Sequence, residues 1–347
     1  MKRITTSIVF FILLFVHALP AQNRALAEGD VRIMFYNTEN YFWPLVDSLD
    51  PLPPKDYSTS GSHHWTWNRF EKKTGDLYKV IASVGELTPP ALIGLCEVEN
   101  RWVLNRLIYE TPLAKYPYGI VHQDSPDGRG IDVALLYQKS TFNLLGRKFF
   151  PVTLSNGRKT RDILYAKGVV NELDTLHVLV CHMPSKYGGA VFSETSRMEA
   201  AKTLRKITDS LLHSSTRANI VVMGDFNDTP DSKSVAEALC ASNNLDGNSP
   251  DSLYNLAIAA HKSGVGSIKF QGKWELIDLI FVSGNLLNVN EPIYCISNAY
   301  RIFFAPYLLE NDNAYTGQKP YRTYNGFKYN GGISDHLPAV LDLRKGY

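Results

Sequence analysis

The stretch IVVMGDFND, residues 220–228, joins four consecutive apolar residues to a polar turn. Short apolar runs rich in β-branched residues favour a buried strand, so residues 220–223 are predicted to form one. Asp225 and Asn227 would then stand where this strand ends. A side chain at a strand end is held by a rigid sheet and still reaches solvent, which suits a functional residue. The alternative is a simple turn whose aspartates cap backbone amides.

An apolar run next to a polar residue recurs along the chain. We predict strands over residues 31–36, 91–95, 133–137, 163–170, 176–181, 220–223, 276–282 and 338–343. Polar residues at the ends of other runs are Asn37, Glu97, His182, Asp278 and the pair Asp335-His336. Each alone has an ordinary structural explanation, such as a loop or a cap at a strand edge. Their shared place at strand ends indicates one common site.

Three segments show helical spacing of apolar residues, 67–84, 194–212 and, more briefly, 234–240. Many strands with few interleaved helices predict an α/β protein in which two packed sheets are flanked by helices. No internal repeat and no linker is evident. The economical interpretation is one domain over residues 28–347.

Residues 1–27 have the pattern of an export signal. Lys2 and Arg3 precede an apolar run over residues 8–19, and Ala25-Leu26-Ala27 offers a cleavage site. The run is too short to span a bilayer comfortably, and no later segment is a better candidate. We therefore expect a periplasmic or secreted protein without a transmembrane segment after signal removal. Loss of the leader's three basic residues would lower the net charge from +2 to −1, which excludes a strong global attraction for long polyanions.

The order of the polar residues resembles that of the endonuclease/exonuclease/phosphatase superfamily, which includes exonuclease III-like repair nucleases and deoxyribonuclease I. The resemblance runs from about Val31 to Leu343, and the sequences GDFN at 224–227 and SDH at 334–336 are its most specific parts. It implies a four-layered α/β sandwich with two mixed β-sheets. It also implies hydrolysis of phosphate esters with the help of a divalent metal.

The resemblance implies that Asn37, Glu97 and Asp335 ligate the metal. Carboxylate and amide oxygens are hard donors that suit Mg²⁺ or Mn²⁺, whose charge neutralises phosphoryl oxygens. None of the four cysteines has the spacing of a thiolate zinc site.

The remaining positions that match the family are predicted to be catalytic. His336 is the candidate general base, with Asp278 orienting its imidazole. Asp225 would orient or deprotonate the attacking water, so whether Asp225 or His336 takes the proton stays open. Asn227 would steady a phosphate oxygen, and His182 would contact the phosphate or protonate the leaving group.

Two arginines are candidates for substrate binding. Arg161 precedes the predicted strand 163–170, as a phosphate-contacting arginine does in deoxyribonuclease I-like members, and Arg129 lies between two glycines. A solvated surface arginine is the alternative for both. Asp132 is considered as a partner of His182, and His122 is assigned to a loop without function.

The substrate is left open between three classes. The preferred one is a nuclease that cuts nucleic acid, and the second is a phosphatase or phosphodiesterase acting on lipid, inositol or other small phosphorylated molecules. The third is a catalytically silent binding protein, which the filled catalytic positions disfavour. Residues 298–332 carry six tyrosines interleaved with basic residues, which predicts an aromatic wall beside the substrate. The protein is expected to be a monomer.

Overall fold

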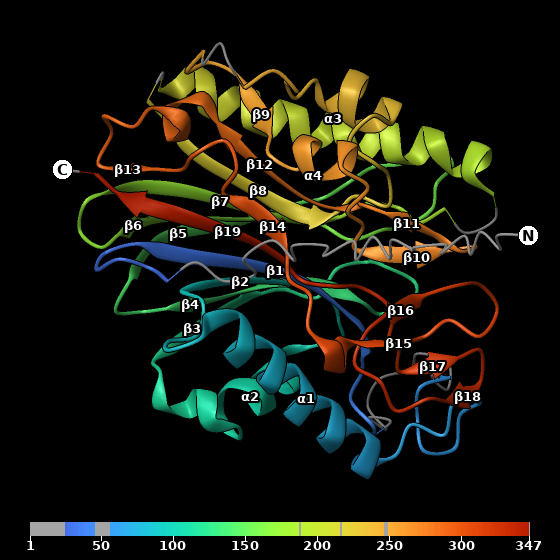
Figure 1. Cartoon of the computed structure of the whole chain (residues 1–347). Helices are drawn as coiled ribbons and strands as arrows, with labels where there is room; N and C mark the ends of the chain where they lie inside the picture. Colours follow the sequence, from blue (N-terminus) through green and yellow to red (C-terminus); the bar gives the residue numbers. More distant parts are fainter. Residues whose placement is uncertain (1–24, 46–55, 187–188, 216, 246–248, 347) are drawn as a thin grey trace, which may run out of the picture.

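The computed structural model describes residues 25–45, 56–186, 189–215, 217–245 and 249–346 (Figure 1). The expected export signal over residues 1–27 therefore lies almost wholly outside the described residues. None of the helices in these ranges is long and apolar enough to cross a membrane.

The first sheet has β1 and β2 at its centre, running parallel to each other, while the other neighbours pair antiparallel. β1 is eleven residues long, because it continues beyond the predicted run 31–36. Across the sheet the strands are β13 (Ile293–Tyr294), β19 (Ala339–Lys345), β1 (Val31–Tyr41), β2 (Leu92–Val98), β4 (Asp132–Gln138) and β3 (Tyr118–His122), and β14 (Tyr300–Ile302) also pairs with β19.

The second sheet repeats this plan, with a parallel pair, β7 and β8, among antiparallel neighbours. Its strands in order are β5 (Phe142–Phe150), β6 (Ile163–Val170), β7 (Asp174–His182), β8 (Asn219–Asp225), β12 (Asp278–Ser283) and β9 (Leu253–Asn255). The inner faces of the two sheets pack directly on each other. A Cβ added to Gly94 of β2 would lie 2.9 Å from the Met223 sulfur of β8, so a larger residue here would force the Met223 side chain to shift.

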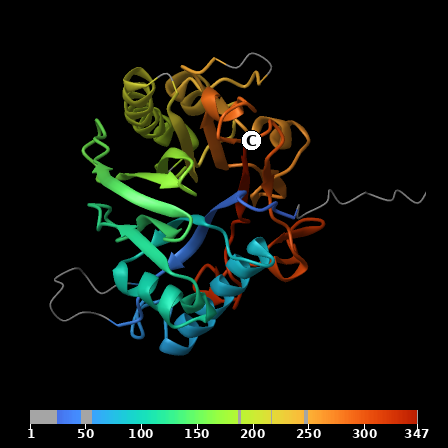
Figure 2. The same cartoon turned by 90° about the vertical axis from the view of Figure 1, so that its left-hand side faces the viewer.

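Helices form the two outer layers, as Figures 1 and 2 show. The first sheet is covered by α1 (Trp67–Gly85) and α2 (Arg101–Tyr109), and the second by α3 (Ala190–Ser214), a short helix over Ser234–Leu239 and α4 (Ile258–Lys262). Single helical turns occupy Pro112–Lys115, Gly284–Leu287 and Pro306–Leu308. The predicted four-layered α/β sandwich is confirmed.

All eight predicted strands and the three predicted helical segments are present, whereas α2, β3 and β5 were not predicted. The helix α2 has only nine residues, too few for a clear period, and begins because the Asn100 side chain accepts hydrogen bonds from the amides of Trp102 and Val103. The edge strand β5 buries little of its surface, so its sequence lacks an apolar run.

The segment 298–332 folds in part as hairpins. It contains two hairpins, β15 (Leu309–Asn311) with β16 (Gln318–Pro320), and β17 (Tyr324–Asn325) with β18 (Lys328–Tyr329). A third hairpin pairs β10 (Ile268–Phe270) with β11 (Lys273–Glu275). All three lie at the end of the molecule toward which β8 points (Figure 1).

Candidate active site

Strand register assembles one half of the site in the second sheet. The last residues of β7 and β8, His182 and Asp225, are parallel partners, and Asp225 pairs across the next ladder with Asp278, the first residue of β12. The three residues therefore form a row across neighbouring strands. Sequence order alone separates them by up to 96 positions, and only the sheet brings them together.

The other half comes from the ends of β1 and β2, where the pairing register shifts between Asn37 and Tyr41. Glu97 lies in this irregular stretch with φ of 58°, a left-handed conformation that costs a non-glycine residue on the order of 1 kcal/mol. The Thr38 hydroxyl donates to the carbonyl oxygens of Cys96 and Glu97 and holds the two strand ends together. Strain at this point turns Glu97 away from the regular pleat.

His336 links the two halves. Its Nδ1 lies 2.8 Å from Asp278 Oδ2, and its Nε2 lies 3.7 Å from Asp225 Oδ2. Asn37 completes the contact, because its Nδ2 donates to Asp225 Oδ2 at 3.0 Å and lies 3.4 Å from His336 Nε2. All three ionisable side chains are buried, with at most 9% of any of them exposed. The predicted Asp278–His336 contact is thus present.

The charges of this group are strongly coupled. Burial alone would lower the pKa of His336, but the carboxylates of Asp278 and Asp225 outweigh it and raise that pKa well above its ordinary value. Burial raises the pKa of Asp225 to about 7, although the charge of His336 opposes this. His336 is therefore the charged partner at neutral pH, and Asp225 is the group poised to exchange a proton.

His182 is neutral in the same surroundings. Burial lowers its pKa well below the ordinary value, and the charges of Arg161, Arg129 and His336 act in the same direction. Its Nε2 lies 3.5 Å from Asp225 Oδ2, which favours the tautomer with the proton on Nε2. Its Nδ1 is buried and accepts no hydrogen bond from any described residue.

Asn227 supports Asp225. Its backbone amide donates to Asp225 Oδ1 at 2.8 Å, and its side-chain amide donates to the carbonyl oxygen of Met183 at 3.0 Å. Its φ of 50° is again left-handed, a conformation that asparagine tolerates better than most residues. The turn after β8 thereby fixes the Asp225 carboxylate.

Two of the predicted metal ligands border this group, since Asn37 donates to Asp225 and Asp335 Oδ1 lies 4.0 Å from His336 Nε2. Glu97 Oε2 accepts from the amide of Asn40 at 3.0 Å and lies 3.5 Å from Arg129, while Asp335 Oδ2 accepts from Arg322 at 3.1 Å. An arginine thus balances the charge of each carboxylate, as a bound divalent cation would. With the amide oxygen of Asn37, the donor set is entirely hard oxygen, which fits Mg²⁺ or Mn²⁺.

A buried network centred on Glu39 lies behind these ligands. Glu39 accepts from the amide of Thr323 at 2.6 Å and from Arg322 at 3.3 Å, and burial, then Asp335, raise its pKa to about 7. The Lys73 ammonium donates to the carbonyl oxygen of Glu39 and to Thr323, and burial lowers its pKa to about 8. Lys73 lies within the predicted helical segment 67–84, and nothing in the sequence distinguishes it from a solvated helical lysine.

Arg161 is buried, so the alternative of a solvated surface residue is wrong for it. Its guanidinium donates to Asp127 at 3.0 Å and to the carbonyl oxygen of Met183 at 2.7 Å, next to His182. Arg129 is half-exposed and donates to Asn40 at 2.8 Å. Both arginines therefore lie beside the candidate site.

Asp132 lies away from the position expected of a partner for His182. It accepts from the amide of Ser125 at 2.8 Å, and its other oxygen lies 3.3 Å from His122. His122 is the last residue of β3 and is therefore not in a loop, contrary to expectation.

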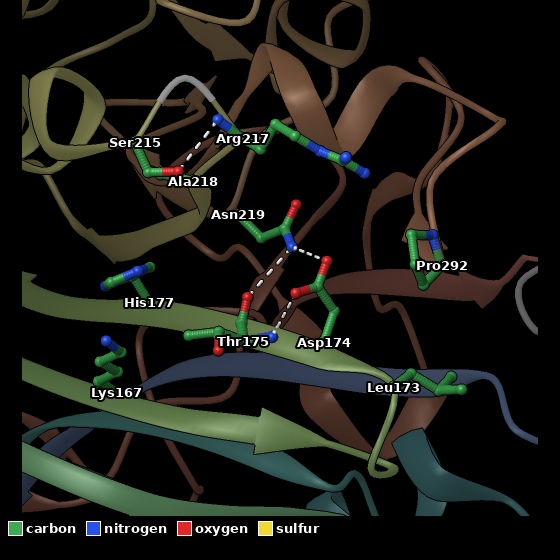
Figure 3. A pocket seen from close by; sticks show the side chains of 10 residues that line it. All are labelled: Lys167, Leu173, Asp174, Thr175, His177, Ser215, Arg217, Ala218, Asn219 and Pro292. Atoms are coloured by element: carbon green, nitrogen blue, oxygen red, sulfur yellow. Dashed lines mark hydrogen bonds between the residues drawn. The ribbon is translucent and has the colours of Figure 1, made fainter.

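A cavity of about 420 Å³ lies apart from this group, at the opposite end of β7 and β8 (Figure 3). Its wall contains the beginnings of the two strands that carry His182 and Asp225 at their far ends. Asn219, which begins β8, donates to Asp174 and to the carbonyl oxygen of Thr175 across the cavity floor. Asn219 and Asp174 thus bond to each other, and none of the predicted site residues lines the cavity.

Two sheets thus meet at a coupled carboxylate–histidine group, and the hard oxygen donors beside it would suit a divalent cation. A profile of the endonuclease/exonuclease/phosphatase family matches residues 32–345. This chain belongs to that family and is a metal-dependent hydrolase of phosphate esters. No curated protein sequence matches the chain at a significant level.

Solved structures share the fold at low identity. An endonuclease/exonuclease/phosphatase family protein from Bacteroides thetaiotaomicron is 15% identical with a TM-score of 0.55, over 90% of this chain and 97% of that one. The human Nocturnin catalytic domain with bound sulfate is 14% identical with a TM-score of 0.53, over 92% and 96% of the two chains. D. rerio TDP2 complexed with single strand DNA product is 12% identical with a TM-score of 0.53, over 91% and 100%.

Proposed function

We propose that this protein is an exported nuclease that cleaves phosphodiester bonds with Mg²⁺ or Mn²⁺. The observation that carries the catalytic part is the buried group of Asp225, His336 and Asp278, in which His336 lies between the two carboxylates next to the predicted oxygen donors Glu97 and Asp335. When bound by those donors, the metal supplies charge neutralisation to the phosphoryl oxygens.

The residues of the chain divide the remaining work. Asp225 takes the proton of the attacking water, because its pKa of about 7 makes it an effective base near neutrality. The His336 imidazolium, held by Asp278, stabilises negative charge that develops on the phosphoryl group. The positive charges of Arg161 and Arg129 attract the phosphate. Nδ1 of His182, which has no partner among the described residues, accepts a hydrogen bond from a protonated substrate group or water.

An aromatic cluster favours nucleic acid as the substrate. It consists of Tyr57, His63, Trp65, Tyr324 and Phe327. The Tyr57 hydroxyl accepts from Asn40 at 3.3 Å, at the edge of the site, and the ring of His63 stacks on Tyr57 at 4.0 Å between centroids. Phe327 lies 5.1 Å beyond His63 and exposes 70% of its surface.

Such a surface suits an unstacked base. Exposed aromatic rings next to basic side chains bind single strands by stacking. Arg69 of α1 lies 4.2 Å over the ring of Tyr329, which belongs to the hairpin that carries Phe327. One structure of similar fold, D. rerio TDP2, is complexed with single strand DNA product. The near-neutral net charge also favours a short single-stranded segment over a long duplex.

The test is cleavage of single-stranded DNA, RNA, bis-p-nitrophenyl phosphate, inositol phosphates and sphingomyelin by purified protein with Mg²⁺, with Mn²⁺ and with EDTA. We expect metal-dependent cleavage of oligonucleotides. Phe327→Ala should raise KM for oligonucleotides by roughly 5- to 100-fold, the value of one lost stacking contact, and leave bis-p-nitrophenyl phosphate unaffected. Phe270→Ala is the control. It removes another exposed ring, 58% exposed on β10, and should leave KM for both substrates unchanged.

Other outcomes identify the alternatives. Cleavage restricted to inositol phosphates or sphingomyelin would replace the nuclease by a small-molecule phosphatase or lipid phosphodiesterase. A folded protein inactive toward all of these substrates with either metal would favour a binding protein.

A further inference from the structure

A second group of ligand-type side chains lies at the ends of β3 and β4. His122 Nε2 lies 3.3 Å from Asp132 Oδ2 and 4.0 Å from Asp124 Oδ1. One ligand atom from each of the three residues falls within 4.8 Å of the others. The group shares no residue with the site described above.

Strand register explains why these residues meet. His122 pairs with Ala134 in the antiparallel ladder of β3 and β4. Continuing the same register brings Asp124 opposite Asp132, and alternation along each strand places all three side chains on one face. Two carboxylates directly opposite each other repel, so this pairing is unfavourable without a cation between them.

Buried polar atoms without partners surround the group. His122 and Asp132 expose only 3% and 4% of their side chains. His122 Nε2 and the hydroxyl of Ser125 are buried and form no hydrogen bond with any described residue, although Asp132 is near. Asp162 Oδ1 is also buried without a hydrogen-bond partner in the described chain. An isolated His–Asp ion pair leaves these atoms unsatisfied, which is costly.

We propose that His122, Asp124 and Asp132 bind a first-row transition metal ion, with Zn²⁺ as the representative. Imidazole nitrogen and carboxylate oxygen are both ligands that zinc accepts, and water would complete a four-coordinate shell. The imidazole distinguishes this site from the all-oxygen donors of Glu97 and Asp335, which suit harder cations.

The ion would stabilise the connection between β3 and β4. That connection carries Asp127, which bonds to Arg161, and Arg129, which contacts Asn40 and Glu97. The proposed site closes the base of this loop, because His122 and Asp124 precede it and Asp132 follows it. Bound metal therefore positions two arginines of the candidate active site without touching the substrate.

The experiment counts bound zinc separately from the catalytic site. A Glu97→Gln variant weakens that site, and in this background the protein is equilibrated with Zn²⁺, dialysed against buffer containing Mg²⁺ and measured by elemental analysis. Thermal unfolding with and without Zn²⁺ is followed in parallel. We expect one equivalent of zinc per chain and a higher Tm with zinc, since a ligand of the native state stabilises it.

Substitutions then assign the zinc. His122→Gln should lower the affinity at least about 100-fold and remove the Tm shift. Asp124→Asn should also weaken zinc binding. Because the Asp124 side chain is exposed, this substitution should leave the fold intact, so weaker binding would not reflect unfolding. His177→Gln is the matched control, because His177 is a partly buried histidine whose Nδ1 lies 2.8 Å from the Tyr165 hydroxyl, far from this group, and zinc binding should be unchanged. Absence of zinc in the Glu97→Gln background, or undiminished binding in both His122→Gln and Asp124→Asn, would overturn the proposal and leave a plain ion pair.

Discussion

Replacing Asp278 by asparagine is expected to lower kcat/KM for a phosphodiester by roughly 10²–10⁴-fold, the usual contribution of a positioned acid–base group. The Asp278 carboxylate is 1% exposed and lies 2.8 Å from His336 Nδ1. Its charge is the largest influence that raises the pKa of His336 against burial. Without that charge, the pKa of His336 should fall, because burial is then opposed only by the weaker influences of Asp225 and Asp335.

The pKa shifts of His336 and Asp225 predict how the rate depends on pH. The raised pKa of His336 keeps the imidazolium charged through neutrality, and activity should fall only as pH rises above that value. Ionised Asp225, with a pKa of about 7, should set the acidic limb. In Asp278→Asn the basic limb should move to lower pH while the acidic limb persists. Rates of bis-p-nitrophenyl phosphate hydrolysis between pH 5 and 10, normalised to folded protein by circular dichroism, measure both limbs.

A double-mutant cycle decides whether the pair acts as a unit. His336→Ala and Asp278→Asn should each cost similar activity, and the double variant should cost little more than either. Asp342→Asn is the control, since Asp342 is a buried carboxylate paired with Arg32 on the far side of the first sheet; it should lower Tm but not turnover per folded molecule. Simple additivity, or a near-normal rate for Asp278→Asn, would refute the pairing.

Three further outcomes are expected. EDTA should abolish activity and Mg²⁺ or Mn²⁺ restore it, and Glu97→Gln should raise the metal concentration needed for half-maximal rate without changing Tm; full activity in excess chelator would contradict this. Exported protein should have its N-terminus between Gln22 and Asp30 by Edman sequencing, and an intact leader on membrane-bound protein would exclude cleavage. Burial lowers the pKa of His177 to about 4, so the unfolded chain takes up this proton first and stability falls as pH drops from 6.5 toward 4; urea titrations should show a smaller loss for His177→Gln.

The strands and the order of their polar ends could be predicted from sequence, because both are local properties. The run over residues 220–223 and the polar turn after it needed only neighbouring residues to be interpreted, and β8 has that form. Edge elements such as β5 and α2 were missed, because they bury too little apolar surface to leave a clear pattern.

The tertiary structure alone decided which polar groups share a site. Strand pairing places His182, Asp225 and Asp278 in one row. In the folded chain Arg161 is buried next to this row, and Asp132 contacts His122 and not His182. It also bears on the charge assignment that the sequence left open, since neighbouring carboxylates raise the pKa of His336 well above its ordinary value while burial raises that of Asp225 to about 7. Register and burial arise from contacts between residues distant in the chain, and the pKa of a side chain depends on the groups that surround it in space.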